Sequence, residues 1–290
     1  MIYFIFLIPS TLLLFLVYVL PIIRYFWLSF HSFSVSTGLE IISNNGANWS
    51  RLINDERFWM DSIQTIRFAF LSVSIELLLS IIIALVLNEN FRGRSIFRVT
   101  TLLPWALPTT IMALGWRWIF NTPYGPINQF IKIFNLNNLD IITNPNLSWI
   151  TTIIADVWKT TPFLALILLA GLQTIPSDLY DAFKLEGGKP IYAFFKISLP
   201  LIKPYLLIGL IFRIAQAFGV FDLIQVMTGG GPAGSTESLA LYAYLNAMRY
   251  LDFGYSSTII LGGFVITSIA TLIACIFVLN LNKLIGIFEK

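Results

Sequence analysis

Charged residues are scarce in this chain of 290 residues: 18 are Lys or Arg and 15 are Asp or Glu, together 11%. Ordinary soluble domains carry about 25% charged residues. Hydrophobic residues make up 57% of the sequence, which leaves too few polar side chains to cover a water-soluble globule. The composition therefore excludes a soluble domain and a disordered chain, and it indicates an integral membrane protein.

Cysteine and histidine are almost absent, with one residue of each. A single cysteine forms no internal disulfide, so a disulfide-stabilised scaffold is excluded. The sequence has no group of His, Cys and carboxylate residues at metal-ligand spacing and no nucleophile beside a base, which argues against an enzyme embedded in the membrane. His31 follows the first apolar run, and we interpret it as a residue of the membrane interface.

A phosphate-binding loop is missing as well. Such a loop needs two glycines and a Lys-Ser/Thr pair at fixed spacing, because its backbone N–H groups surround the phosphates. The nearest match surrounds Gly188-Lys189, but Phe183 stands where the first glycine belongs and Pro190 replaces Ser/Thr. We therefore expect no cofactor in this chain, and any ATP must be hydrolysed by another subunit.

Long apolar runs with few charges predict six membrane-spanning helices, because about 20 apolar residues cross a bilayer. The predicted spans cover about residues 2–30, 63–87, 99–120, 149–173, 201–227 and 253–281. The first run lacks the basic start and the cleavage site of a signal peptide, so we interpret it as a retained helix. The predicted fold class is all-α and integral to the membrane, with residues 1–290 as a single transmembrane domain.

The cations in the loops predict the orientation of these spans. One set of ends carries nine of them: Arg92, Arg94, Arg98, Lys184, Lys189, Lys196, Lys203, Lys283 and Lys290. The opposite loops carry four: Arg51, Arg57, Lys132 and Arg249. Cytoplasmic loops are the richer in Lys and Arg, so we expect the first set, and with it both termini, in the cytoplasm.

The inner loop of residues 174–200 has helix signals of its own. Ser177 is a candidate N-cap after a proline, and Gly187-Gly188 stops the helix because glycine accepts the left-handed conformation. Pro190 is suited to the first position of a second helix, which Leu199-Pro200 ends. The loop is therefore predicted to form two short helices joined by a tight turn.

The first of these helices has one apolar face. Leu179, Ala182 and Phe183 are spaced i, i+3 and i+4, and Tyr180 lies beside them. Such a face without a core of its own predicts a docking partner, and a helix lying on the bilayer surface is the alternative. We favour the groove of a protein partner, because acidic residues flank the face and a Gly-Gly turn follows it.

The segment Asp181-Ala-Phe-Lys-Leu-Glu-Gly187, followed by Ile197-Ser-Leu-Pro200, resembles the EAA loop of ABC importer permeases. Further motifs, in the order expected, resemble the carbohydrate-uptake branch of that family, of the maltose-permease and glycerol-3-phosphate-permease type. They are Asn48-Trp49, Phe58-Trp59, Gly93 to Arg98, Leu103 to Pro108, Trp116-Arg117-Trp118, Tyr124-Gly125, Phe221 to Pro232 and Asp252 to Tyr255. The resemblance covers roughly residues 48–282.

The resemblance implies the type I ABC importer fold, with six transmembrane helices and a cytoplasmic coupling helix, in the cell membrane. It implies a second permease subunit, two copies of an ATPase that bind ATP and Mg, and an extracytoplasmic solute-binding protein. The substrate it implies is a sugar, and a polyol or glycerol-3-phosphate is the alternative. Membrane lipid surrounds such a subunit, and no nucleic acid is expected as a partner.

The coupling helix would transmit movement of the ATPase to the two flanking spans. Its predicted contact residues are Ser177, Leu179, Asp181, Ala182, Phe183, Glu186 and Gly187. Two of them depart from the family pattern: Asp181 stands for the leading glutamate and Phe183 for the second alanine. Because Phe183 is larger than alanine, we expect it to fill more of the partner's groove and to favour a dedicated ATPase.

A substrate site is predicted on the two spans that flank this loop. Asp156 and Lys159 are spaced i, i+3 and can pair with each other, and Arg213 and Gln216 repeat that spacing. Polar groups beside an aromatic ring suit a sugar, whereas a buried helix–helix salt bridge is the structural alternative. Counted from the family motifs, the resemblance places sugar-contacting positions at Asp156, Lys159, Thr160, Phe163, Gln216, Ala217 and Val220.

Glu76 and Asp222 are the remaining acids within spans, and we expect each to pair with a partner subunit rather than with substrate. Together, Glu76, Asp156 and Lys159 leave a second class of function open, a gradient-driven secondary transporter with a proton relay. Such carriers usually contain internal repeats, which this sequence lacks. Uptake that depends on ATP, rather than on a proton gradient, distinguishes the two.

Overall fold

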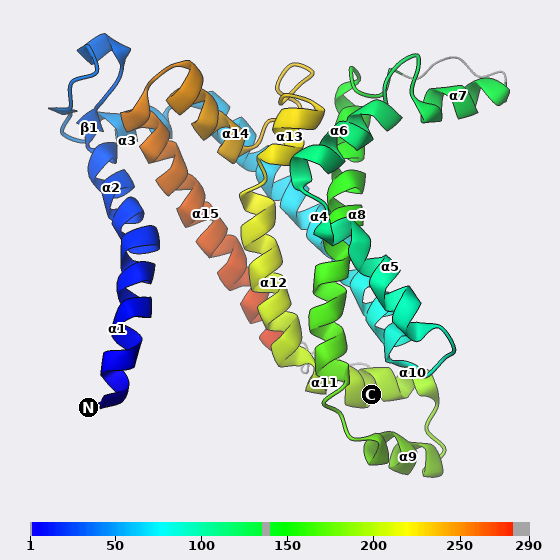
Figure 1. Ribbon diagram of the computed structural model, residues 1–290. Helices are drawn as coiled ribbons and strands as arrows, with labels where there is room; N and C mark the ends of the chain where they lie inside the picture. The colour runs from blue at the N-terminus through cyan, green and yellow to red at the C-terminus, as the bar shows by residue number, and fades with distance from the viewer. Residues whose placement is uncertain (1, 135–139, 281–290) are drawn as a thin grey trace. The chain divides into compact units, whose positions relative to one another are not determined.

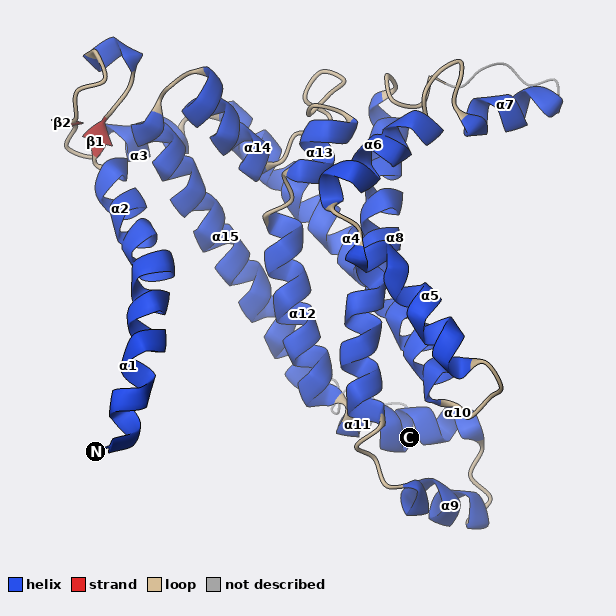
Figure 2. Ribbon diagram, viewed as in Figure 1, coloured by secondary structure: helices blue, strands red, loops and turns tan. Residues whose placement is uncertain are grey.

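The computed structural model describes residues 2–134 and 140–280, and its regular structure is almost entirely helical (Figures 1 and 2). Two short strands, β1 (His31–Ser32) and β2 (Ile42–Ser43), form an antiparallel pair in which His31 lies opposite Ser43. The all-α prediction is thereby confirmed. Lys283 and Lys290, which entered the orientation argument, and residue 281 of the last predicted span lie outside the described residues.

The chain divides into two compact units. The first contains residues up to Ile63 together with Ser238–Ile266, and the second contains Gln64–Glu237 together with the residues from Thr267 onward. Helices α4 (Glu56–Asn88) and α15 (Phe253–Leu279) pass from one unit into the other. Each unit is described by itself below.

Four helical segments in the described part of the chain are long and apolar enough to cross a membrane: Phe6–Ser29, α4, α8 (Pro145–Leu172) and α15. The first is continuous through α1 (Ile2–Leu14), a π-helical turn and α2 (Leu20–Ser29). A fifth exists if Pro190–Leu201 and α12 (Lys203–Phe218), bent by 69°, form one span. These segments match the predicted spans 2–30, 63–87, 149–173 and 253–281 in position.

The predicted span 99–120 is interrupted. Helix α5 (Arg94–Ala106) ends and helix α6 (Thr109–Ile119) begins on either side of Leu107-Pro108. Leu107 is extended, with ψ 137°, because the ring of a following proline disfavours the helical conformation. The sequence predicts one span over these residues, and Pro108 marks the point at which its helix is broken.

The predicted span 201–227 is interrupted as well. Helix α12 ends at Phe218 and helix α13 (Asp222–Met227) begins three residues after Gly219. Gly219 caps the end of α12 through its backbone N–H, and Phe221 before α13 has φ −130° and ψ −62°, which is not helical. Glycine lowers the helical preference at this point, so a break here follows from the sequence in retrospect.

In the first unit, α3 (Ala47–Ile53), α14 (Leu239–Tyr244) and the start of α15 pack around a hydrophobic core. The core residues are Leu52, Phe58, Leu239, Tyr242, Ala243, Tyr255 and Ile259. The Asn48 amide donates to the backbone carbonyls of Ser29 at 3.2 Å and His31 at 3.0 Å. The Asn48-Trp49 motif therefore anchors the end of α2 to α3 and has a structural role.

The motif Asp252 to Tyr255 begins helix α15. Asp252 Oδ1 accepts from the backbone N–H of Tyr255 at 3.1 Å, and Oδ2 pairs with Arg51 at 2.8 Å. Gly254 lies so close to β1 that a Cβ there would stand 2.2 Å from the carbonyl oxygen of His31. The acid is needed as a cap and the glycine for close packing, so this motif also serves the fold.

Asp55 is the hub of a polar cluster just before α4. Its carboxylate accepts from the Tyr242 hydroxyl at 2.6 Å, from the Tyr255 hydroxyl, and from the N–H groups of Arg57 and Phe58 at 3.0 and 3.3 Å. Burial alone raises the pKa of the Asp55 carboxyl, but these hydrogen bonds together lower it below its usual value. Burial and the bond to Asp55 raise the pKa of Tyr242 to about 12.

The substitution Asp55→Asn should make the unfolding temperature less dependent on pH in the acidic range. The pKa of Asp55 is depressed in the folded state, so the stability contributed by its carboxylate is present above the unfolded pKa of about 3.9. That contribution is lost as pH falls through the folded-state pKa. Thermal unfolding of detergent-solubilised protein from neutral pH to about pH 3 measures it, with exposed Glu40→Gln as the control. Parallel curves for the wild type and Asp55→Asn would contradict the prediction.

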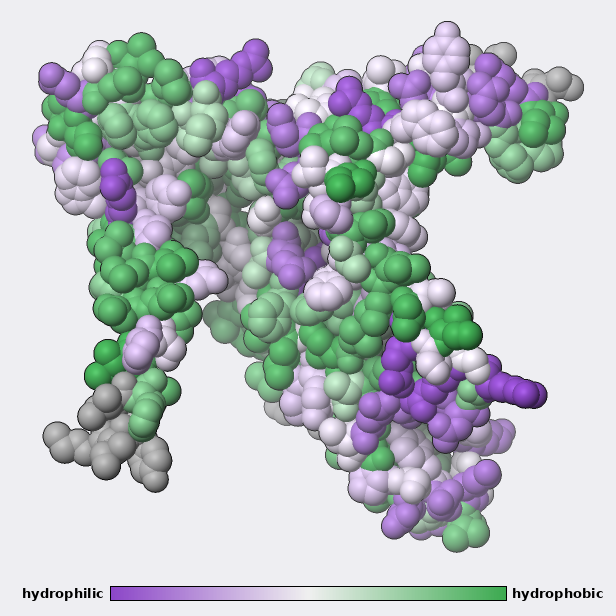
Figure 3. Space-filling view, viewed as in Figure 1, coloured by the Kyte–Doolittle hydropathy of each residue, from purple (hydrophilic) through white to green (hydrophobic). Residues whose placement is uncertain are grey.

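In the second unit, α8 packs against α5, α12 and α13, and α13 packs against α6. Helix α7 (Pro126–Ile133) follows α6, and the short helices α9 (Ser177–Leu185), α10 (Pro190–Ala193) and α11 (Leu199–Leu201) follow α8 (Figure 1). In Figure 3, hydrophobic side chains cover the middle of α5, α8 and α12, and hydrophilic ones gather where α9 and the start of α5 lie. This distribution is typical of a membrane-embedded bundle with one polar end.

Candidate functional site

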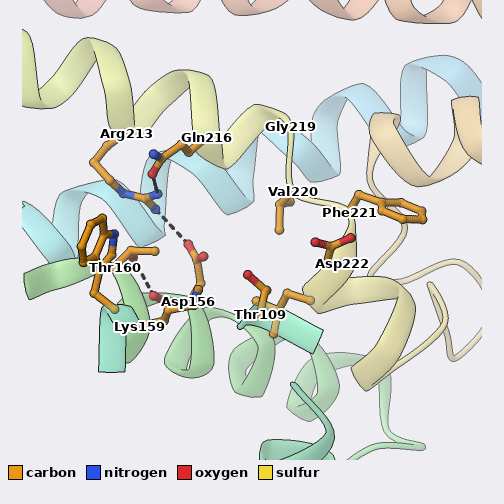
Figure 4. Close-up of a pocket in the computed structure, with 12 residues that line it drawn as sticks. Thr109, Asp156, Lys159, Thr160, Arg213, Gln216, Gly219, Val220, Phe221 and Asp222 are labelled. Carbon is orange, nitrogen blue, oxygen red and sulfur yellow. Dashed lines mark hydrogen bonds and ion pairs between the residues drawn. The ribbon is translucent and has the colours of Figure 1, made fainter. Parts of the chain in front are cut away.

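A cavity of about 350 Å³ lies in the second unit where the two interrupted helices meet α8 (Figure 4). Its lining residues come from α5, α6, α8, α12 and α13 and are Trp105, Thr109, Asp156, Lys159, Thr160, Arg213, Gln216, Gly219, Val220, Phe221, Asp222 and Leu223. Helix breaks in membrane proteins are tolerated where the freed backbone groups are buried in protein or border a cavity. Both breaks described above border this one.

Arg213 organises the wall of the cavity. Its guanidinium donates to Glu76 on α4 through Nε and, at 2.8 Å, through Nη2, and it donates to Asp156 on α8 at 3.1 Å. A further bond at 2.8 Å runs from Nη1 to Gln216. Arg213 is 1% exposed and Glu76 is fully buried. Arg213 and the two carboxylates therefore join three helices, α4, α8 and α12, and the buried salt bridge that was the structural alternative is present.

Thr160 completes this network. Its hydroxyl lies 2.8 Å from Glu76 Oε1 and 2.6 Å from the carbonyl oxygen of Asp156. Two carboxylates face one guanidinium here, so one negative charge would be in excess if both were ionised. A buried charge needs full hydrogen bonding to be tolerated, which explains why Thr160 and Gln216 surround the ions.

Lys159 does not pair with Asp156, although their i, i+3 spacing allowed it. Its Nζ donates instead to the backbone carbonyl of Leu107, at the end of α5. That carbonyl has no partner within its own helix, and a lysine near a helix C-terminus satisfies such groups. Lys159 therefore stabilises the break between α5 and α6, and Asp156 is left to Arg213.

Aromatic rings flank one side of the cavity. Trp105 lines it, and its ring stacks on Phe163 with centroids 5.6 Å apart and planes 17° apart. Phe163 also meets Phe212 edge to face at 6.3 Å. We predicted Phe163 and Ala217 as contact residues; neither lines the cavity, and Ala217 is buried. Phe163 lies behind Trp105 and packs against its ring.

The other predicted substrate residues are brought together. Asp156, Lys159, Thr160, Arg213, Gln216 and Val220 all line the cavity. Our reading of the sequence missed Glu76, which holds Arg213, and also Trp105, Thr109 and Asp222. Asp156, Asp222 and Thr109 point toward the same space in Figure 4. An acid inside an apolar run was the available signal for Glu76, but its spacing did not name its partner.

No group of three or more His, Cys, Asp or Glu side chains within residues 2–134 and 140–280 is placed to hold a metal ion. The loop of residues 228–236 after α13 is closed by its own hydrogen bonds: the Thr228 and Thr236 hydroxyls lie 2.7 Å apart, and Thr236 donates to the Gly231 carbonyl at 2.9 Å. This arrangement agrees with a connector.

The inner loop contains the two predicted helices. Helix α9 covers Ser177–Leu185 and ends before Gly187, whose φ of +79° is the left-handed conformation expected at that position. The second helix begins at Pro190, also as predicted, and continues through a π-helical turn to Leu201. The predicted cap was wrong by one residue: Pro176 holds the N-cap position, and Ser177 is the first helical residue.

Tyr180 and Phe183 turn back onto their own loop. The Tyr180 hydroxyl lies 2.8 Å from the Ser198 hydroxyl, and a Cβ on Gly188 would stand 2.2 Å from the Phe183 ring. Phe183 is half-buried against its own loop, and its contact with a partner's groove stays a prediction. Leu179, Ala182 and Leu185 are the exposed apolar residues of α9, and Leu185 is 90% exposed.

The sequence profile of the binding-protein-dependent transport system inner membrane component matches residues 76–286. The trehalose/maltose transport system permease protein MalF of Thermococcus litoralis is 40% identical over 255 residues, which cover 88% of this chain and 86% of that protein. The sulfoquinovosyl glycerol transport system permease protein SmoG of Agrobacterium fabrum is 36% identical over 251 residues, covering 87% and 82%.

A solved structure is also similar in fold. A chain from the crystal structure of a bacterial alginate ABC transporter, in complex with an alginate pentasaccharide-bound periplasmic protein, has a TM-score of 0.80. The match covers 94% of this chain and 92% of that one at 19% sequence identity. The similarity therefore extends over nearly the whole backbone.

Proposed function

Because the chain belongs to the family of binding-protein-dependent transport system inner membrane components, we propose that it is a membrane-spanning subunit of an ATP-driven sugar importer. The observation that supports a substrate site is the cavity bounded by Arg213, Asp156 and Trp105. It lies between the helices that flank the inner loop, and its size falls in the range of small-molecule sites.

The chemistry of the lining supports a sugar. Asp156, Asp222 and Gln216 offer hydrogen-bond acceptors for hydroxyl groups, and Thr109 offers a donor as well. The Trp105 ring, held by its stacking on Phe163, offers an apolar face for the C–H side of a pyranose. Polar groups beside a rigid aromatic surface are the usual composition of a site that binds a polar ring.

The charges of the site favour a neutral sugar over glycerol-3-phosphate. Three donor nitrogens of Arg213 are already bonded to Glu76, Asp156 and Gln216, so the guanidinium has little left to offer a phosphate. Lys159 is bonded to a backbone carbonyl, and Asp222 adds a further carboxylate to the lining. An anion entering this space would meet more negative than free positive charge.

For the whole subunit, we propose one transmembrane permease domain of residues 1–290 with the type I importer topology. Helices α5 and α6 then count as one interrupted span and α12 with α13 as another, which gives six spans together with the four long segments. Both termini and α9 would be cytoplasmic. The partners would be a second permease subunit, two ATPase copies that bind ATP and Mg, and an extracytoplasmic solute-binding protein.

Helix α9 is proposed as the coupling helix that the ATPase moves, and the spans on either side of it would rotate with it. Because Phe183 packs on its own loop, the contact with the ATPase would be made by the exposed residues of the motif. These are Ser177, Leu179, Asp181, Ala182, Glu186 and Gly187.

Uptake by the complete transporter in proteoliposomes tests this function. We expect accumulation of labelled trehalose or maltose that requires the binding protein and ATP and is inhibited by vanadate, with glycerol-3-phosphate as the competing substrate. Gln216→Ala should weaken uptake by removing an acceptor, and Thr100→Ala, on the exposed surface of α5, should not. Uptake driven by a proton gradient without the ATPase would instead support the secondary transporter.

A further inference from the structure

The motif Gly93 to Arg98, at the start of α5, has no role in the site described above. Arg94 is held in place there by two bonds, from Nε to the carbonyl of Leu87 at 2.6 Å and from Nη1 to the Asn90 side chain at 3.1 Å. These bonds fix the guanidinium beside the last turn of α4. A cation held this firmly is positioned for a specific contact and is not a freely moving surface charge.

A second arginine converges on the same point. Arg98 lies one helical turn after Arg94, so both face the end of α8. With its amide oriented to match these neighbours, the side-chain oxygen of Gln173 accepts from Arg94 Nη2 at 3.1 Å and from Arg98 Nη2 at 3.3 Å. Arg98 Nε is buried and has no hydrogen-bond partner. The two guanidinium groups therefore share one neutral oxygen, and the Nε–H of Arg98 has no acceptor.

No carboxylate in the described part of the chain neutralises Arg94 and Arg98. Over residues 2–134 and 140–280, no carboxylate forms an ion pair with Arg94 or Arg98, nor with Arg92 in the preceding loop. Two like charges held side by side repel each other unless an anion lies between them. A bound anion can supply the counter-charge that the described residues do not supply, and an oxyanion that accepts several N–H bonds matches two guanidinium groups.

The surroundings indicate where that anion comes from. On the opposite side of α5, Ile96, Val99 and Leu103 are 72%, 60% and 58% exposed, a surface that contacts lipid chains in a bilayer. Both arginines belong to the first turns of α5, and hydrophilic residues gather around the start of this helix in Figure 3. If the proposed orientation holds, this level is that of the cytoplasmic head groups, which carry negative charge.

We propose that Arg94 and Arg98 bind the phosphate of an anionic phospholipid at the inner surface of the membrane. The phosphodiester would occupy the position between the two guanidinium groups and accept from the Nη2 atoms now shared by Gln173, and from Arg98 Nε. The acyl chains would lie along α5. This proposal goes beyond substrate transport, and it requires only that the chain spans the membrane in the proposed orientation.

Lipid-dependent stability of the purified full-length subunit in detergent tests the proposal. Phosphatidylglycerol should raise the wild-type unfolding temperature by several degrees, whereas phosphatidylcholine or inorganic phosphate should not. The double substitution Arg94→Gln/Arg98→Gln should remove the phosphatidylglycerol effect and reduce the amount of anionic lipid retained on purification at least threefold. Arg92→Gln, an exposed arginine two residues earlier, removes a charge without touching the site and should behave as the wild type.

Three results would overturn the proposal: an unchanged lipid effect in the double variant, an equal loss in Arg92→Gln, and an equal effect of inorganic phosphate, which would indicate a soluble anion. If the double variant does not fold, Arg98→Lys serves in its place. This variant keeps the charge but loses the buried Nε donor, so retained lipid should fall while the protein remains inserted. Lipid retention is measured without transport, so the result is independent of the sugar assignment.

Discussion

Replacing Arg213 by methionine should destabilise the protein by about 3–5 kcal/mol, the cost found when one partner of a buried ion pair is removed. The substitution leaves Glu76 and Asp156, both buried, without their shared cation. One or both carboxylates must then take up a proton, and the contacts that join α4, α8 and α12 are lost. We expect a large drop in the unfolding temperature and no measurable uptake.

Neutral replacements of the acids provide the matched control. In the triple variant Arg213→Met/Glu76→Gln/Asp156→Asn no charge is left buried, so a large part of the lost stability should return. Uptake should not return, because Asp156 lines the cavity. Thermal unfolding in detergent and transport in proteoliposomes separate the two effects. A single Arg213→Met variant as stable as the wild type would contradict the assignment of this network.

Gly187→Pro or Asp181→Lys should abolish uptake while leaving the subunit inserted. Gly187 has φ +79°, whereas the proline ring requires about −65°, so the turn after α9 cannot form with proline. Asp181→Lys reverses the charge of an exposed acid on α9, the helix that we propose contacts the ATPase. Neither residue contacts the substrate cavity. The expected loss is at least a hundredfold in transport, with binding of the ATPase subunit weakened.

Glu40→Lys is the control for Asp181→Lys, since it makes the same change of charge in an exposed loop of the first unit. It should leave uptake intact. Co-purification of the ATPase with the membrane subunit reports on docking, and the amount of subunit in the membrane fraction reports on insertion. Normal transport by either Gly187→Pro or Asp181→Lys would remove the coupling role of α9.

The helical elements were predictable from the sequence where the signal is local. A proline and two glycines at fixed positions were enough to place α9, its left-handed end at Gly187 and the restart at Pro190. Pro108 and Gly219 are local signals of the same kind, and the helices end next to both of them. At the first break Lys159 donates to the Leu107 carbonyl, and both breaks border the cavity.

The substrate site was predictable only in part. Spacing along α8 and α12 placed Asp156 and Gln216 on faces that do line the cavity. The same spacing suggested a bond between Asp156 and Lys159, which is absent, and gave no sign that Glu76 belongs to Arg213. Likewise, the sequence pattern of α9 predicted an apolar face. It did not show that the Phe183 ring packs against Gly188.

The order of residues alone therefore determined the membrane class, the positions of most long helices and the turn chemistry of the inner loop, because these depend on neighbours within about one helical turn. Tertiary structure decided which carboxylates share Arg213, which side chain satisfies the Leu107 carbonyl at the end of α5, and which rings support the cavity. The partner of a buried charge lies on another helix, and only the packing of the helices places the two side chains within bonding distance.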